Sequence, residues 1–449
     1  MSDYMFMLES HLSADQNRVV SAVQSKASEA GVNLFLTGGA MRDMLGGFRV
    51  RDLDFVVEGN ALKMAKAVAA SAGASITAVD ELRRSAELVF PGGVTAQIAM
   101  SRQERYGRPG SKPHVSPATI QEDLRGRDFT INAIALSLAR ASRGLLLDPA
   151  NGLADLHSRE LRTVHPYAFY DDPSRLLRFV RLRTRLGFQP EPRTRSQYES
   201  ARLQNMERHI PARLLLEELR QIAGELSPAD VVRALDEEKL LVLFCPSLEG
   251  AKLNLAGLAK LDKIRRLIPP GSEFRFDNFG PFLLVLTEKL TPREKQTLVA
   301  NVGMSKADAE RWQKLPLRAR KLETVLKSPG LRQPSQIYHA VSKAGGDEVL
   351  FLLYHSDLKP VQDRLRNYLQ KYLPAALEVS DAEVSAAGGS PGTPKFQKAK
   401  EDLISRRLNA RPKPVPPPEA IPAEPAEPKP GEEKGLRRGR PPGRAAAKS

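Results

Sequence analysis

Strand-forming segments are concentrated in about the first 138 residues of this sequence, and no other feature restricts the fold as much. An apolar strand at residues 34–36, a Gly38-Gly39 turn, a helical segment and a second strand at 52–57 open the pattern. After residue 138 the strand signals nearly vanish, and apolar residues recur at helical spacing. The sequence therefore predicts an α+β fold, in which a mixed sheet with helices is followed by an all-helical remainder.

Composition limits the class of protein and its partners. The single cysteine, Cys245, excludes an internal disulfide framework, and no run of about 18 apolar residues occurs. We therefore expect a cytoplasmic protein with no membrane partner. The 68 Lys and Arg outnumber the 53 Asp and Glu, so the net charge of +15 favours a polyanionic partner such as nucleic acid. Residues 412–449 hold almost no large apolar side chain and are predicted to be a disordered, Pro-rich basic tail.

Two carboxylates, Asp52 and Asp54, stand two residues apart in the predicted second strand. Because side chains alternate across a strand, both are expected on the same face of the sheet. Paired oxygen ligands suit Mg²⁺, and two such ions can activate a hydroxyl and steady a leaving pyrophosphate. Taken alone, the Asp-X-Asp pattern is also common on solvated loops.

The Gly38-Gly39 pair lies between the first strand and the first helix, about ten residues before the carboxylates. Glycines there permit a positive φ and let backbone N–H groups approach a phosphate. Arg42 follows one helical turn later. The alternative is a tight strand-to-helix turn followed by a surface pair of acids.

Four sequence motifs follow one another along the first half of the chain. They are residues 37–43 with 51–55, residues 122–133, residues 148–156 and residues 171–181. In this order they resemble the motifs of the class II CCA-adding tRNA nucleotidyltransferase and bacterial poly(A) polymerase family, within the polymerase β-type nucleotidyltransferase superfamily. A weaker likeness extends through residues 209–219 and 380–408.

The resemblance implies a catalytic head at 1–138, a helical neck that selects the base at 139–205, a helical body at 206–290 and an RNA-binding helical tail at 291–411. It also implies that Asp52 and Asp54 are catalytic and hold Mg²⁺. An N-terminal helix cap remains the alternative for the Arg127-Asp128 pair, and a helix-start position for Asn132. The nucleotide-binding residues implied are Gly38, Gly39, Arg42, Arg127, Asp128, Asn132, Asp172, Arg175, Arg178 and Arg181.

The fourth motif also predicts base selection on physical grounds. If Asp172 and Arg175 lie on one helix, their i and i+3 spacing makes them neighbours on one face. A carboxylate accepts and a guanidinium donates, which suits the edge of cytosine or adenine and leaves uracil or guanine unpaired. Arg178 and Arg181 continue the same face and are expected at the triphosphate. A solvated basic face is the alternative.

Two segments depart from the family pattern. Gln97 stands where the family usually carries an acid, so a third negative charge beside the metal is missing. Residues 80–88 lack the Gly-Thr turn of the family's flexible loop. The length of the product is therefore left open by the sequence.

The resemblance implies an enzyme that adds CMP and AMP, from CTP and ATP, to the 3′ end of tRNA without a template and releases pyrophosphate. One alternative is a poly(A) polymerase or A-only adding enzyme of the same family. Another is a non-catalytic RNA-binding paralogue that has lost turnover through Gln97. The acceptor RNA and the oligomeric state are left open by the sequence.

Overall fold

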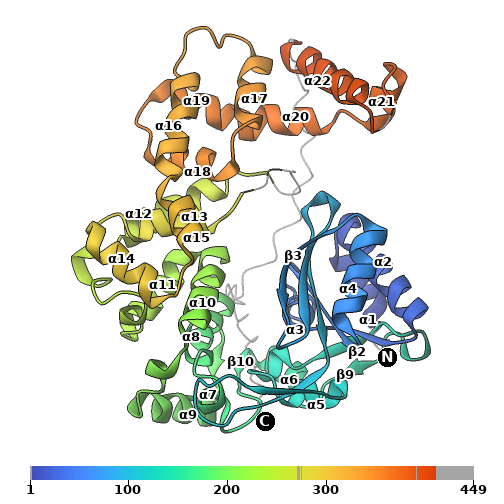
Figure 1. Ribbon diagram of the computed structural model, residues 1–449, viewed down its shortest axis with the longest axis vertical. Helices are drawn as coiled ribbons and strands as arrows, with labels where there is room; N and C mark the ends of the chain where they lie inside the picture. The colour runs from blue at the N-terminus through green and yellow to red at the C-terminus, as the bar shows by residue number, and fades with distance from the viewer. Residues whose placement is uncertain (1–2, 270–273, 275, 391, 411–449) are drawn as a thin grey trace, which may run out of the picture. The chain divides into compact units, whose positions relative to one another are not determined.

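The computed structural model describes residues 3–269, 274, 276–390 and 392–410 (Figure 1). The residues up to Asn409 cluster as one unit. The α+β prediction is confirmed, since a mixed sheet with helices is followed by a helical remainder. The tail predicted at 412–449 lies outside the described residues.

The N-terminal part is built on a seven-stranded sheet with the strand order β3-β4-β5-β2-β1-β8-β9. Strand β2 pairs antiparallel with β1 and parallel with β5, so it lies inside the sheet. Strands β4 and β5 form a hairpin around Pro91-Gly92-Gly93. The strands are β1 (Asn33–Thr37), β2 (Leu53–Glu58), β3 (Ser75–Asp80), β4 (Ser85–Val89), β5 (Thr95–Met100), β8 (Ala135–Ser137) and β9 (Leu146–Leu147).

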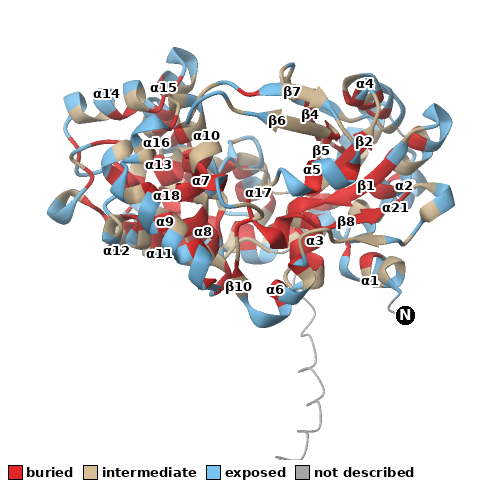
Figure 2. Ribbon diagram, turned by 90° about the horizontal axis from the view of Figure 1, so that it is seen from below, coloured by how far each residue is buried: buried red, intermediate tan, exposed pale blue. Residues whose placement is uncertain are grey.

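Helices α2 (Ala14–Ala30) and α4 (Ala61–Ala72) cover one face of this sheet, where they pack on alternate, buried residues of the strands such as Leu53 and Phe55. Figure 2 shows the inner strands buried along most of their length. On the opposite face, α5 (Ile120–Arg125) packs on Phe35 and Val56. Asp54 projects from this second face, because it alternates with Leu53 and Phe55.

Short strands interrupt the part that was expected to be all-helical. β9 extends the large sheet, and β10 (Glu160–Leu161) pairs with β11 (Gln189–Pro190). Strands β9, β10 and β11 have two residues each, too few to leave a readable alternation in the sequence, which explains why they were missed. Within the first 138 residues, where strands were expected, a separate hairpin forms from β6 (Arg102–Arg105) and β7 (His114–Pro117).

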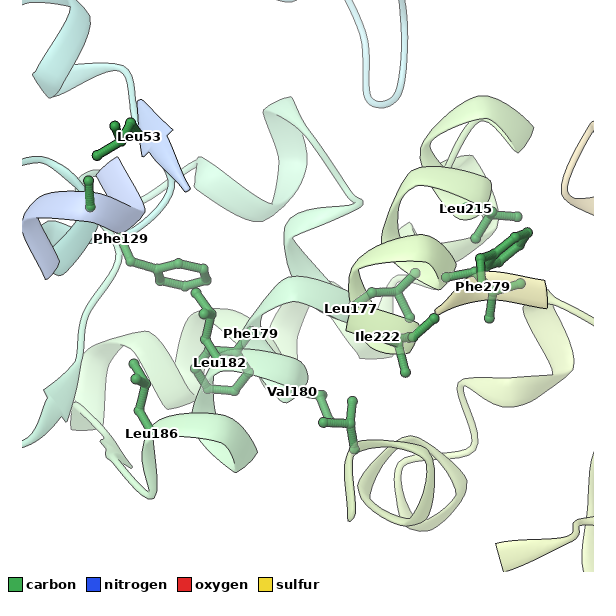
Figure 3. Packing of buried hydrophobic residues seen from close by; sticks show 14 of the residues in the cluster. Leu53, Phe129, Leu177, Phe179, Val180, Leu182, Leu186, Leu215, Ile222 and Phe279 are labelled. Carbon is green, nitrogen blue, oxygen red and sulfur yellow. The ribbon is translucent and has the colours of Figure 1, made fainter. Parts of the chain in front are cut away.

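Helix α8 (Arg175–Leu186) connects the sheet to the helical part. Gly187 ends the helix in the left-handed conformation, with φ 65°. Its buried Phe179 lies 6.1 Å from Phe129 and 4.8 Å from Tyr198 between ring centroids. Figure 3 shows Phe129 and Phe179 meeting in the core. This aromatic contact joins the segment after α5 to α8 and to α9 (Pro192–Leu203).

The remaining helices pack mainly through leucine, valine and aromatic side chains. A second apolar cluster is formed by α16 to α19 and their neighbours. No described helix combines the length and the apolar character that a membrane span needs. The helices whose bounds have not yet been given are α1 (Tyr4–His11), α3 (Gly38–Leu45), α6 (Gly152–Ser158), α7 (Ala168–Asp171), α10 (Ala212–Gly224), α11 (Pro228–Glu237), α12 (Leu255–Arg265), α13 (Phe279–Leu286), α14 (Pro292–Asn301), α15 (Lys306–Gln313), α16 (Leu315–Leu326), α17 (Pro334–Ser342), α18 (Gly346–His355), α19 (Lys359–Asn367), α20 (Leu373–Leu377), α21 (Asp381–Ala386) and α22 (Pro394–Asn409).

Candidate active site

A small polar cavity opens where β2 and α3 meet α8. Its volume is about 170 Å³, below the range of about 300–1,000 Å³ that holds a whole small molecule, so it suits part of a ligand. Five arginines and three aspartates contribute to its wall. The lining residues are Gly39, Arg42, Asp43, Arg51, Asp52, Asp54, Asn132, Arg178, Arg181, Leu182, Arg185 and Gln221.

Asp52 and Asp54 both line this cavity, as expected from their spacing. Asp52 lies one residue before β2 rather than inside it, and its Oδ1 accepts a hydrogen bond of 2.5 Å from the Thr95 hydroxyl. Asp54 Oδ2 accepts from the backbone N–H of Gly39 at 3.0 Å. Burial and the neighbouring Asp52 raise the pKa of the Asp54 carboxyl, against the opposing effects of Arg127 and Arg42. A bound cation would relieve this repulsion.

The Gly38-Gly39 turn brings α3 against Asp54. Gly38 has a φ of +63°, and a Cβ at this residue would lie 2.9 Å from Asp54 Oδ2. The turn therefore requires glycine on two counts, its left-handed backbone and the close approach of the carboxylate. Gly39 then presents its N–H to the same oxygen atom.

The second motif supports the floor of the cavity. Arg42 Nη1 donates to Asn132 Oδ1 at 2.7 Å, and Asn132 Nδ2 donates to Asp128 Oδ1 at 2.9 Å. Asp128 is followed by a short 3-10 turn at Thr130–Asn132, so the alternative of an α-helix cap there is wrong. Arg127 lies outside the cavity wall and donates to Thr37 Oγ1 and to Asp123 Oδ2.

Arg178 and Arg181 line the cavity from α8 but are already paired. Arg178 contacts Asp128 at 2.9 Å and Glu218 at 3.0 Å. Arg181 contacts Glu218 at 3.1 Å and Glu225 at 2.9 Å. Although burial opposes its ionisation, Arg178 and Arg175 hold the pKa of Asp128 well below its usual range. The placement of Arg178 and Arg181 at the triphosphate stays a prediction, and the structure adds that both guanidinium groups are held in a buried ion-pair network.

Two further arginines of the wall, Arg51 and Arg185, were missed by the sequence reasoning. Arg185 lies 2.6 Å from Asp43 and 3.6 Å from Glu225, and Arg51 lies 3.2 Å from Glu225. Burial and the nearby Arg42 lower the pKa of Arg185 to about 10 despite Asp43. The spacing of 178, 181 and 185 on one helical face was the signal that could have identified Arg185.

The expectation that Asp172 and Arg175 share a helix is wrong. Asp172 lies in the break between α7 and α8 with an extended backbone, φ −128° and ψ 94°. Pro173 explains this break, because proline disfavours a helical conformation in the residue before it. Asp172 Oδ1 accepts from the N–H and the hydroxyl of Ser174 at 3.0 and 2.6 Å, and Arg175 donates to the carbonyl of Gly126 at 3.0 Å.

Asp172 lines a second, larger cavity of about 370 Å³ rather than the first. Among its other lining residues, none had been singled out from the sequence as a site residue. They are Asp80, Leu82, Arg83, Tyr106, Gly110, Ser111, Lys112, Pro113, Pro211, Arg213 and Leu214.

The donor set at the first cavity fits a magnesium ion. No group of three or more His, Cys, Asp or Glu in the described part of the chain is placed to hold a metal. Mg²⁺ keeps several waters and is usually bound by one or two carboxylates plus substrate phosphates, so the Asp52 and Asp54 pair is sufficient. Gln97 lies beside Asp54 in the β2–β5 register, and Glu87 lies beside Gln97 in the β4–β5 register.

The comparisons with known proteins bear on the part of the chain that holds this cavity. Residues 34–162 match the family described as poly A polymerase head domain. The resemblance identified from the four motifs is thereby confirmed.

Curated relatives carry more specific names. The chain is 30% identical over 341 residues to the A-adding tRNA nucleotidyltransferase of Aquifex aeolicus, covering 75% of this chain and 40% of that protein. It is 36% identical over 212 residues to the CC-adding tRNA nucleotidyltransferase of Deinococcus radiodurans, covering 47% of this chain and 55% of that protein. The chain thus spans about half the length of the relatives it matches.

A solved structure supports the fold along nearly the whole chain. The apo form II of a CCA-adding enzyme is 23% identical, has a TM-score of 0.53 and covers 92% of this chain and 96% of that one. At this level of identity the likeness concerns the fold.

Proposed function

We propose that this protein adds CMP and AMP, from CTP and ATP, to the 3′ end of tRNA without a template. The observation that carries the proposal is the pair Asp52 and Asp54 in a cavity walled by arginines. The carboxylates suit divalent cations, and the arginines suit the phosphates of a nucleotide. The family of residues 34–162 and the names of the relatives agree with this chemistry.

In the proposed reaction the 3′-hydroxyl of the RNA attacks the α-phosphate in line. The new O3′–P bond forms as the bond to the β-phosphate oxygen breaks, so pyrophosphate leaves. When bound by Asp52 and Asp54, Mg²⁺ would supply positive charge at the α-phosphate and make the hydroxyl more acidic. Gly38-Gly39, Arg42, Asn132, Arg178 and Arg181 are proposed to hold the triphosphate.

The side chains proposed to bind the triphosphate are themselves fixed by hydrogen bonds and ion pairs. Glu218 receives both Arg178 and Arg181, and Asp128 is bonded to Arg178 and Asn132. Side chains fixed in advance lose little freedom when the nucleotide binds, which favours positioning and electrostatic stabilisation of the transition state. Arg127, paired with Asp123 and Thr37, is proposed to fix the turn beside Asp54.

Base selection is proposed at Asp172 and Arg175. The break at Pro173 leaves Asp172 as an acceptor in the second cavity, whereas Arg175 does not line that cavity and its buried Nε has no hydrogen-bond partner among the described residues. A carboxylate that accepts and a guanidinium that donates would together fit the amino-bearing edge of cytosine or adenine. Uracil and guanine would leave buried polar groups unpaired.

A template-free extension assay tests the proposal. With tRNA transcripts that lack CCA, we expect the variant Asp52→Ala plus Asp54→Ala to incorporate nucleotide at least about 1,000-fold more slowly than wild type. Asp363→Ala, an exposed aspartate on α19, serves as the matched control and should retain wild-type rates. Equal incorporation by the double variant and wild type would refute the proposal.

An A-adding activity is the second candidate, favoured by the A-adding relatives of Aquifex aeolicus and Geobacter sulfurreducens. CTP, ATP and their mixture, offered separately, discriminate between the two. Incorporation of C and then A from the mixture supports CCA addition, whereas incorporation of A alone, in one step or in a long tract, supports an A-adding enzyme or a poly(A) polymerase.

A non-catalytic RNA-binding paralogue remains the third candidate because of Gln97. Tight tRNA binding without pyrophosphate release under any nucleotide mixture would favour it. In that case Gln97→Asp should restore turnover, since it places a third carboxylate beside Asp54. The net charge of +15 supports an RNA partner in every case and predicts an affinity that falls steeply with salt.

A further inference from the structure

The second cavity is lined in part by an aromatic residue, Tyr106, to which the proposed function assigns no role. Its volume of about 370 Å³ lies within the range of small-molecule sites. Its lining combines an aromatic and apolar set with a charged set. The first set is Leu82, Tyr106, Pro113, Pro211 and Leu214, and the second is Asp80, Arg83, Lys112, Asp172 and Arg213.

Tyr106 follows β6 and is fixed by its hydroxyl group. The hydroxyl donates to Glu104 Oε2 at 2.6 Å, and Glu104 is held by Arg83 at 3.0 Å and by Arg102 at 2.8 Å. Although burial opposes its ionisation, Arg102 and Arg83 lower the pKa of Glu104 to about 2. The acceptor of the tyrosine hydroxyl is therefore a permanent carboxylate, and the ring has one preferred position.

The ring is only partly buried and forms part of the cavity wall. Asp172 lines the same cavity, and the charges of both Asp172 and Arg175 act on the Tyr106 hydroxyl. Ser174 occupies Asp172 Oδ1, whereas Oδ2 has no hydrogen-bond partner among the described residues. The cavity lining thus combines an aromatic residue with a carboxylate that has one oxygen without a hydrogen-bond partner among the described residues.

We propose that Tyr106 is the stacking wall of a nucleobase site in this cavity, where the base edge meets Asp172. Every nucleobase has a π face, and stacking on an aromatic side chain strengthens binding by about 5- to 150-fold. Two sources supply this ligand chemistry, the incoming nucleotide and the 3′-terminal nucleotide of the RNA. The inference rests on the proposed function, because it takes nucleotides as the ligands of the chain.

Two substitutions of Tyr106 distinguish a stacking role of its ring from a structural role of its hydroxyl group. Tyr106→Phe keeps the ring and loses the bond to Glu104, whereas Tyr106→Leu loses the ring. We expect the phenylalanine variant to stay within about 2-fold of wild type and the leucine variant to raise a KM by about 10-fold. Tyr167→Leu is the matched control, since this tyrosine is 68% exposed and does not line the cavity.

The substrate whose KM changes identifies the source of the base. A raised KM for CTP or ATP assigns the site to the incoming nucleotide, and a raised KM for the RNA assigns it to the acceptor end. Equal losses in Tyr106→Phe and Tyr106→Leu, or no change in either, would overturn the proposal. Loss of all extension by Asp52→Ala plus Asp54→Ala tests the underlying function separately.

A binding measurement covers the case in which Tyr106→Leu fails to fold. Tyr106→Trp combined with Trp312→Phe places the only tryptophan of the chain in the cavity wall, because the sequence contains one Trp. A stacked base should quench its fluorescence when CTP, ATP or the RNA is added. Absence of quenching by all three ligands would overturn the inference.

Discussion

The two halves of the chain bury different kinds of side chain. Up to residue 226, charged groups are buried repeatedly, whereas Asp262 is the one buried charged side chain in the described part of the chain beyond it. The later helices are packed through apolar clusters such as that of α16 to α19. The buried charged residues of the first half are Arg42, Asp43, Asp123, Asp128, Asp155, Asp172, Arg175, Arg181, Glu191, Glu218 and Glu225.

This difference separates the region that holds the proposed nucleotide site from a region built on apolar clusters. A buried ion pair often contributes less to stability than well-packed apolar side chains of similar volume. The buried charges around the cavity of Asp52 and Asp54 therefore suit the proposed role of holding arginines beside phosphates better than a role in stability. The later helices are held together mainly by apolar contacts.

The largest expected effect comes from removing a carboxylate that two buried arginines share, which should lower both activity and stability. Glu218→Ala leaves Arg178 and Arg181 without their common partner, and loss of one partner from a buried pair costs about 3–5 kcal/mol. We expect extension to slow by at least about 100-fold, because misplaced arginines no longer meet the phosphates. Steady-state kinetics and urea unfolding measure both effects. Glu217→Ala, at the exposed neighbouring glutamate on α10, is the control, and comparable losses in both variants would contradict the role of Glu218.

A cavity in the apolar half should affect stability without affecting chemistry. Leu350 on α18 is fully buried, so Leu350→Ala should lower the free energy of unfolding by about 2–5 kcal/mol. The KM for CTP and ATP should stay at the wild-type value at a temperature where the variant is folded. Leu317→Ala, at a leucine that is 60% exposed, is the control. A changed nucleotide KM in Leu350→Ala would contradict the prediction that the apolar half affects stability alone.

Asp262, the buried charged residue of the second half, should lower the free energy of unfolding at neutral pH. Burial raises the pKa of Asp262 to about 6, against the opposing effects of the Ala229 N–H and Arg265, and its Oδ1, 3.9 Å from Arg265 Nη1, has no hydrogen-bond partner in the described residues. Because this pKa is raised on folding, ionisation destabilises the fold increasingly as pH rises from about 4 to 6. Asp262→Asn should therefore raise the unfolding temperature by about 2 °C at pH 7.5.

The gain from Asp262→Asn should shrink as pH falls from 6 towards 4, because wild-type Asp262 is then protonated. Calorimetry at both ends of this range measures the effect. The exposed Asp363→Asn should show neither the gain nor its pH dependence. A gain that is independent of pH would show that burial of the charge is not its cause.

Helix ends, turns and the side-chain alternation of strands could be predicted from the sequence, because they depend on neighbouring residues. Helix α4 is an example, because Asn60 caps its first turn and Gly73 ends it in the left-handed conformation. The Gly38-Gly39 turn and the placement of Asp52 and Asp54 in one cavity followed from side-chain alternation and backbone freedom. The division into head, neck, body and tail stays a prediction.

The sequence by itself thus determined the elements, the acidic pair and the arginine face of α8. Tertiary structure alone decided which partners those groups meet, since Glu218 and Glu225 reach α8 from segments about 40 residues away. It also decided that Asp172 faces a second cavity with Tyr106 rather than sharing a helix with Arg175. The physical reason is that backbone preferences act between near neighbours, whereas a charge in a low-dielectric interior is governed by whatever the fold brings within a few ångströms.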